Sequence, residues 1–260
     1  MPTPFPPAPL DFREDVERAA AARHLGDLEL LANEVQGFEW ESDGLRIVTS
    51  ALAALHESSR GEIVSKLGRI ILFTGHMIDA PGRKTPRFPA PKEGAARQAI
   101  REAVQKELSL SGGIAFGVAG GASGGDTLFH EVCGELGVPT KLFLALPPEE
   151  YVQESVLSGG PQWVERFHRI LASHPPRILS EARKEPEYQP RWLREKPDYG
   201  IWQRNTLWML HNVVAERADG IILIALWDRK AGDGPGGTAD VVQKASERGA
   251  KIVILDTNTL

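Results

Sequence analysis

The chain has 260 residues, of which 42% are apolar and 25% are charged, a composition typical of soluble globular proteins. A net charge of −5 gives no general reason to bind nucleic acid, and no apolar run approaches the roughly 18 residues that cross a bilayer. We therefore expect no nucleic-acid partner, no membrane span and no signal peptide. A single cysteine, with no zinc-type cluster, predicts a cytoplasmic protein without a metal site.

The N-terminal region is acidic and helical in pattern. Residues 1–68 carry 12 acidic and 6 basic side chains. After a proline-rich tail, apolar stripes predict two successive helices over 11–35 and a third over 44–58. These helices hold no chemical motif, so we expect them to pack against the main domain or to bind a second copy or an effector partner. We predict a boundary near Gly68, which separates a helical region, 1–68, from a second domain, 69–260.

From Arg69 onward, short apolar runs alternate with amphipathic helices, a pattern of β-α-β units. The predicted strands are Ile70–Phe73, Ile114–Val118, Thr140–Leu146, Arg177–Leu179, Gly220–Trp227 and Lys251–Leu255. The predicted helices cover about 92–108, 126–137, 148–156, 161–172, 201–216 and 238–248. The strands are continuously apolar, as in sheets covered on both faces. The sequence therefore predicts a doubly wound, mostly parallel, Rossmann-like α/β domain.

Ligands of such sheets bind beyond the carboxyl ends of the strands, so the loops after strands are the candidate sites. The first loop contains Thr74, Gly75 and His76 and continues to Asp79, Arg83 and Arg87. Glycine permits close approach of the backbone, and the polar side chains can hydrogen-bond a sugar or base. The alternative is a tight turn whose polar groups face solvent.

The second loop has four glycines in six positions, immediately before a helix. It reads Gly120, Gly121, Ala122, Ser123, Gly124, Gly125 and Asp126. Exposed amides at the start of the helix would bind a phosphate, with Ser123 as a further donor, and Gly124→Val should weaken binding more than folding. The loop is neither a dinucleotide fingerprint nor a Walker A motif. Asp126 as a helix N-cap and the loop as a structural turn are the alternatives.

The third loop follows the strand that ends at Trp227 and has a similar composition. Its candidate residues are Asp228, Gly236, Gly237, Thr238 and Asp240. Two phosphate-binding turns at one sheet edge fit a nucleotide better than a simple monoanion. A flexible surface turn with Thr238 as N-cap is the alternative.

The segments FTGH at 73–76, GGASGGD at 120–126 and GPGGT at 234–238 resemble the SLOG superfamily, a Rossmann-like group related to DprA and the LOG cytokinin-activating enzymes. The resemblance covers about 69–260 and is strongest to SLOG modules beside helical repeats and signalling or immune domains. It implies that the two glycine-rich turns bind a nucleotide. The LOG pattern PGGxGTxxE is not kept, because Gln243 stands eight positions after Pro235. A LOG-type phosphoribohydrolase reaction thus lacks its expected glutamate.

Two further segments are candidates for the same crevice. Arg204 and Asn205 lie in a helix in which Arg204 can bind phosphate and Trp208, one turn later, can stack on a base. The alternatives are a solvated arginine and a core tryptophan, beside a buried stripe that includes Leu207 and Val214. The basic, proline-containing stretch 180–199 is a candidate lid over an anion, or a solvated loop.

No catalytic arrangement emerges from the sequence. His76, Asp79, Asp126, Asp228 and Asp240 come from loops that meet at one sheet edge, but their spacing assigns no acid or base. Cys133 falls on the apolar face of its helix, which favours a core position over a nucleophile. His130 is predicted on the helix surface.

These observations lead to a binding module: a sensor of a nucleotide-derived signal, such as an ADP-ribose-like or cyclic nucleotide species, held at the carboxyl edge of a parallel sheet. No other cofactor is expected. The competing hypothesis is a hydrolase of a nucleotide or N-glycosidic bond that uses carboxylates in the same crevice. A scaffold without a ligand is the third hypothesis.

Overall fold

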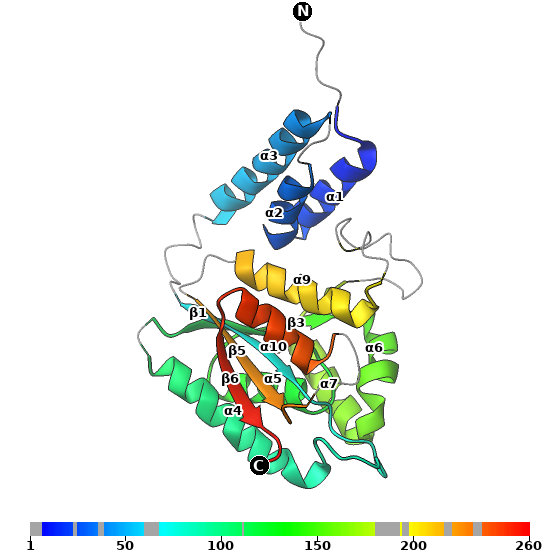
Figure 1. Cartoon of the computed structure of the whole chain (residues 1–260), viewed down its shortest axis with the longest axis vertical. Coiled ribbons are helices and arrows are strands. Elements are labelled where there is room, and N and C mark those ends of the chain that lie inside the picture. The colour runs from blue at the N-terminus through cyan, green and yellow to red at the C-terminus, as the bar shows by residue number, and fades with distance from the viewer. Residues whose placement is uncertain are drawn as a thin grey trace, which may run out of the picture. The chain divides into compact units, whose positions relative to one another are not determined.

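A computed structural model describes residues 7–22, 25–35, 39–59, 68–110, 112–179, 193, 198–215, 220–230 and 236–260. Contacts divide the chain into two compact units (Figure 1). The first comprises Met1–Lys66, Pro186–Asp198 and His211–Arg217, and the second Leu67–Glu185, Tyr199–Leu210 and Ala218–Leu260. Most of the predicted lid at 180–199 lies outside the described residues.

The first unit contains three N-terminal helices, α1 (Leu10–Ala21), α2 (Leu25–Glu34) and α3 (Glu41–Ser59). Their apolar stripes meet in a separate core, in which Phe12, Leu28, Leu31 and Val48 are almost completely buried. The phenyl ring of Phe12 packs on the indole of Trp40, with 4.9 Å between ring centroids. Helices α1 and α2 have 12 and 10 residues and are too short to be stable alone in water, so the shared core stabilises them.

The second unit is built on a six-stranded parallel sheet. Its strands are β1 (Arg69–Gly75), β2 (Ile114–Ala119), β3 (Thr140–Leu144), β4 (Arg177–Ile178), β5 (Ile221–Trp227) and β6 (Lys251–Asp256). Their order is β4-β3-β2-β1-β5-β6, so β1 lies between β2 and β5. The predicted doubly wound, Rossmann-like α/β fold is confirmed.

Helices cover both faces of this sheet. After β1 the chain forms η2 (Ala90–Lys92), α4 (Glu93–Leu108), α5 (Gly125–Glu135), α6 (Pro148–Ser155), η3 (Leu157–Gly159), α7 (Pro161–Ser173), α9 (Ile201–Ala215) and α10 (Thr238–Glu247). The strand order runs outward from β1 to β4 in one direction and from β5 to β6 in the other. Because parallel crossovers are right-handed, the two directions place their helices on opposite faces, α4 and α5 on one and α10 on the other.

Aliphatic and aromatic side chains of the strands explain why the sheet is central. Ile70, Ile71, Leu72 and Phe73 of β1 are each at most 1% exposed. The ring of Phe73 stacks on Phe129 of α5 at 4.7 Å between centroids. No helix within the described part of the chain is long and apolar enough to cross a membrane.

Candidate functional site

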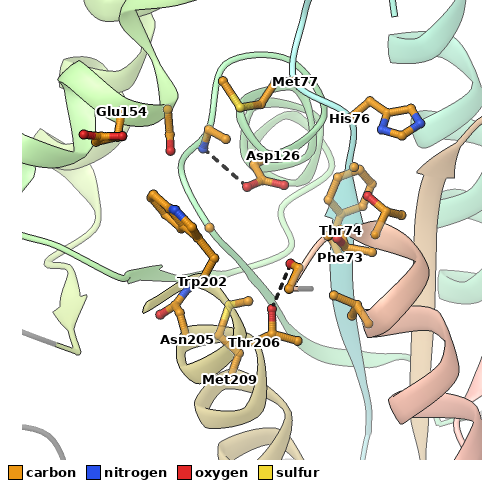
Figure 2. A pocket seen from close by; sticks show the side chains of 18 of the residues that line it. Phe73, Thr74, His76, Met77, Asp126, Glu154, Trp202, Asn205, Thr206 and Met209 are labelled. Carbon is orange, nitrogen blue, oxygen red and sulfur yellow. Dashed lines mark hydrogen bonds between the residues drawn. The ribbon is translucent and has the colours of Figure 1, made fainter. Parts of the chain in front are cut away.

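A pocket of about 380 Å³ lies at the carboxyl ends of β1 and β2 and beside the first residues of α10 (Figure 2). The direction in which the strand order runs reverses between β1 and β5. Such a switch point is the usual ligand site of open parallel sheets. All the residues that line this pocket belong to the second unit.

Ten of the predicted site residues line the pocket: Thr74, Gly75, His76, Gly120, Ala122, Asp126, Asn205, Gly236, Gly237 and Thr238. Seven others do not line it: Gly121, Ser123, Gly124, Gly125, Arg204, Asp228 and Asp240. The pocket thus draws together the ends of three loops and one helix that are up to 164 residues apart in the chain (Thr74 to Thr238).

The amides of the first glycine-rich turn are largely bonded to the protein itself. Gly121 N–H donates to the Tyr151 hydroxyl over 3.1 Å, and Ala122 N–H donates to Asp126 Oδ2 over 3.3 Å. Ser123 N–H donates to the Ser155 carbonyl over 2.9 Å. A phosphate would have to displace these acceptors, so the amides of Gly121, Ala122 and Ser123 are not the exposed donors that the sequence predicts.

Gly124 joins the turn to the end of β1. Its φ of 102° is rarely adopted by side-chain-bearing residues, and an added Cβ would lie 2.5 Å from the Ile78 nitrogen. Met77 and Gly124 form an antiparallel bridge, and Gly125 N–H donates to the His76 carbonyl over 3.1 Å. The glycine is therefore required for backbone packing, which contradicts the expectation that Gly124→Val would affect binding more than folding.

Asp126 provides a carboxyl group at the pocket (Figure 2). It accepts the Ala122 amide, and burial raises its pKa to about 7. Burial, followed by the negative charge of Asp126, raises the pKa of the Tyr151 hydroxyl far above its usual value. At neutral pH a large share of the Asp126 carboxyl groups retain the proton, so the group can donate as well as accept a hydrogen bond.

The second glycine-rich turn differs in its bonding. Gly236 N–H donates to Asp240 Oδ2 over 3.3 Å, and Asp240 also pairs with Lys244. Thr238 is the first residue of α10, where amides have no acceptor within the helix. Among the described residues, no acceptor is bonded to the Thr238 amide. This helix N-terminus lines the pocket and attracts negative charge.

His76, Asp228 and Arg87 form a buried polar cluster beside the pocket. His76 Nε2 lies 3.0 Å from Asp228 Oδ1, and Arg87 donates to both Asp228 oxygens over 3.0 Å each. Burial lowers the pKa of His76, and Arg87 leads the groups that hold the pKa of Asp228 well below its usual range in spite of burial. The cluster fixes the ends of β1 and β5, so these predicted ligand groups are already engaged with one another.

Helix α9 contributes Trp202 to the pocket, and Trp208 takes the core position that was one of its two predicted alternatives. Trp208 is 1% exposed and packs on Phe143 at 4.8 Å between centroids, which places it in the core. Trp202 lines the pocket (Figure 2), and its ring contacts that of Tyr151 edge to face, with 5.8 Å between the ring centroids. Val214 was expected in a buried stripe but is 46% exposed. Leu207 of the same predicted stripe is 5% exposed, so the difference lies near the C-terminal end of the helix.

Several pocket residues were not among the predicted site residues. They are Phe73, Met77, Arg83, Arg87, Tyr151, Glu154, Ser155, Trp202, Thr206, Met209 and Val241. Arg83, Arg87 and Trp202 lie in segments that the sequence predicts to border the site. Tyr151, Glu154 and Ser155 come from α6, where the sequence carries no glycine-rich loop or motif.

Two buried groups near the glycine-rich turn are structural. Cys133 is fully buried, and burial raises the pKa of its thiol to about 12, so it lies in the core as expected. His130 is buried, contrary to its predicted surface position. Its Nε2 donates to the Gly120 carbonyl over 2.9 Å, and burial lowers its pKa to about 4. Among the described side chains, no group of three or more potential ligands could hold a metal ion.

Comparison with known proteins identifies no family. No family model and no curated protein matches the chain. The crystal structure of Streptococcus suis SuiB bound to S-adenosylmethionine is similar at 10% identity and a TM-score of 0.24, covering 81% of this chain and 52% of that one. Another SuiB crystal structure gives 9% and 0.25, covering 82% and 55%. This chain spans about half the length of these proteins. At such low TM-scores, nothing about the function of this chain follows from the similarity.

Proposed function

We propose that the second unit binds a nucleotide-derived small molecule in this pocket and acts as a sensor of the SLOG type. The proposal rests on one observation. The rings of Phe73, Tyr151 and Trp202, here called the aromatic wall, line the same pocket as the α10 N-terminus, at the switch point of a parallel sheet. The volume of about 380 Å³ falls within the range of small-molecule sites. The resemblance of its loops to the SLOG superfamily favours the same ligand class.

Each part of a nucleotide has a chemically matched surface. The indole of Trp202 offers a flat face for a base. The amides at Gly237 and Thr238 suit a phosphate, with Arg83 adding positive charge to the lining. The carboxyl groups of Asp126 and Glu154 suit the hydroxyl groups of a ribose. ADP-ribose-like and cyclic nucleotides combine these three chemistries.

Calorimetric titration of the chain with AMP, ADP, ADP-ribose and cyclic AMP tests the proposal. At least one should bind with a Kd below about 100 μM. Trp202→Leu should weaken that binding about tenfold or more, because stacking on a base is lost. Trp227→Leu is the matched control, since Trp227 lies outside the pocket and should leave affinity unchanged. Failure of all four compounds to bind at millimolar concentration would overturn the proposal.

Asp126 favours a second candidate function, hydrolysis of an N-glycosidic bond. A carboxyl group that holds its proton near pH 7 can protonate a leaving base while the C–N bond breaks. Water would add its oxygen to the anomeric carbon and give its proton to Glu154, the other carboxylate in the lining. Chromatography of the same mixtures separates the two functions. Release of free base, abolished in Asp126→Asn, would establish an enzyme, and intact ligand after prolonged incubation would favour a sensor.

A further inference from the structure

Asn205 stands out among the polar side chains of the pocket. It is 6% exposed, it lines the pocket, and its side-chain oxygen has no hydrogen-bond partner in the part of the chain that the structure describes. Its neighbour Thr206 is satisfied, because the hydroxyl donates to the Gly236 carbonyl over 3.3 Å (Figure 2). A buried acceptor without a donor lowers stability, so its presence calls for a reason other than folding.

The position of Asn205 relative to Trp202 supplies that reason. The two residues are three positions apart on α9 and therefore lie on neighbouring turns of one face. Both line the pocket, so the face of an indole and a carboxamide border the same space (Figure 2). A flat heterocycle stacked on Trp202 would turn its polar edge toward groups beside the ring.

Close packing holds this pair in place relative to the phosphate-binding end. Gly236 has a φ of 89°, and a Cβ there would lie 2.7 Å from the Gln203 nitrogen. The turn before α10 therefore rests directly on the backbone of α9, with the Thr206 hydroxyl bonded across the junction. The distance between the aromatic wall and the α10 N-terminus is fixed by backbone contact.

We propose that Trp202 and Asn205 form a base subsite that selects 6-aminopurines, an inference that rests on the function proposed above. The carboxamide offers an acceptor and a donor side by side, which matches the exocyclic amine and the adjacent ring nitrogen of adenine. Rotation about χ2 turns either end of the amide toward the cavity. On the edge that carries N7, guanine and hypoxanthine present two acceptors, O6 and N7, of which the amide can satisfy only one, and cytosine covers less of the indole.

Titration with a series of nucleoside monophosphates tests this selection. AMP should bind at least about tenfold more tightly than purine riboside monophosphate, which has hydrogen at position 6, and more tightly than IMP and CMP. Asn205→Leu keeps the number and branching of the side-chain heavy atoms and removes the hydrogen bonds. In this variant the preference for AMP over purine riboside monophosphate should fall below about threefold.

Stability and a control variant separate selection from structure. Because the Asn205 oxygen is unpartnered, Asn205→Leu should be at least as resistant to urea as the native chain. Gln203→Ala is the matched control, since Gln203 lies on the same helix and does not line the pocket, and it should keep the preference for AMP.

The outcomes distinguish the two proposals. Nucleotides that bind equally well whatever the group at position 6, or a loss of urea resistance in Asn205→Leu with the preference retained, would overturn the base subsite alone. The absence of binding by every nucleotide would overturn the proposed function itself.

Discussion

The two glycine-rich turns of the sheet look alike in sequence and differ in use. In the turn at 120–126, Tyr151, Asp126 and the Ser155 carbonyl occupy successive amides, and Gly124 presses against the backbone that follows β1. In the turn at 236–238, the protein leaves the Thr238 amide open at the start of α10, as far as the described residues show. Glycine allows close backbone packing in both turns, at Gly124 and at Gly236, and the turns differ in how many of their amides the protein itself accepts.

The largest effect should come from Gly124→Ala. The added Cβ meets the Ile78 backbone at 2.5 Å in a conformation with positive φ, so we expect a loss of more than about 3 kcal/mol in the free energy of unfolding. Gly94→Ala, in α4 with open space around the new methyl group, is the control and should be neutral or slightly stabilising. Urea denaturation measures both. Equal stability of the two variants would contradict the packing role of the first turn.

The second prediction is that Asp126→Asn changes how the free energy of unfolding depends on pH. Burial raises the pKa of Asp126 to about 7, so the folded chain retains a proton that the unfolded chain releases between about pH 4 and 7. Native stability therefore falls as pH rises through this window, by about 4 kcal/mol at most and less where water reaches the carboxyl. Asparagine cannot ionise and still accepts the Ala122 amide.

Urea denaturation at pH 4 and pH 8 checks this expectation. Asp126→Asn should match the native chain near pH 4 and exceed it by about 1–3 kcal/mol at pH 8. Asp228→Asn should instead be less stable than the native chain at both pH values, because the lowered pKa of Asp228 keeps its carboxylate ionised from pH 4 upward and the substitution removes a charge that accepts two bonds from Arg87. A variant at position 126 that is less stable than the native chain at pH 8 would show that the carboxylate is needed in its charged form.

A smaller effect is expected from Tyr151→Phe. The hydroxyl accepts the buried Gly121 amide, and its removal should cost about 1–2 kcal/mol of stability. The phenyl ring remains, so the packing against Phe167 should persist. Thermal unfolding followed by circular dichroism measures the loss. An unchanged melting temperature would mean that water replaces the hydroxyl and that this amide is available to ligands after all.

The smallest change in stability is expected in the second turn. Gly237 has φ −77° and ψ 178°, an extended conformation that any residue adopts, so Gly237→Ala should alter stability by no more than about 0.5 kcal/mol. The methyl group enters the lining of the pocket and should weaken nucleotide binding about tenfold. A stability loss as large as that of Gly124→Ala would erase the contrast between the turns.

Local patterns were sufficient for the fold and insufficient for the bonding of the site. The strand expected from Ile70 to Phe73 extends to Gly75, and the helix expected near 161–172 spans Pro161–Ser173, because apolar runs and helical stripes are local properties. The hydrogen bond of the Gly121 amide is accepted by a tyrosine 30 residues away, and the hydrogen bonds that Asp228 accepts come in part from an arginine 141 residues away. Spacing along the chain carries no information on such pairs.

The central position of β1 also bears on how the chain is synthesised. Ile70 pairs with Phe116 on one side, but its partner on the other side is Ile221, some 150 residues later. Until β5 leaves the ribosome, β1 is the bare edge of a half-built sheet, formed by Ile70, Ile71, Leu72 and Phe73. Unpaired apolar edges recruit strands from other chains. Nascent chains that stall between β4 and β5 should therefore be the species most dependent on chaperones.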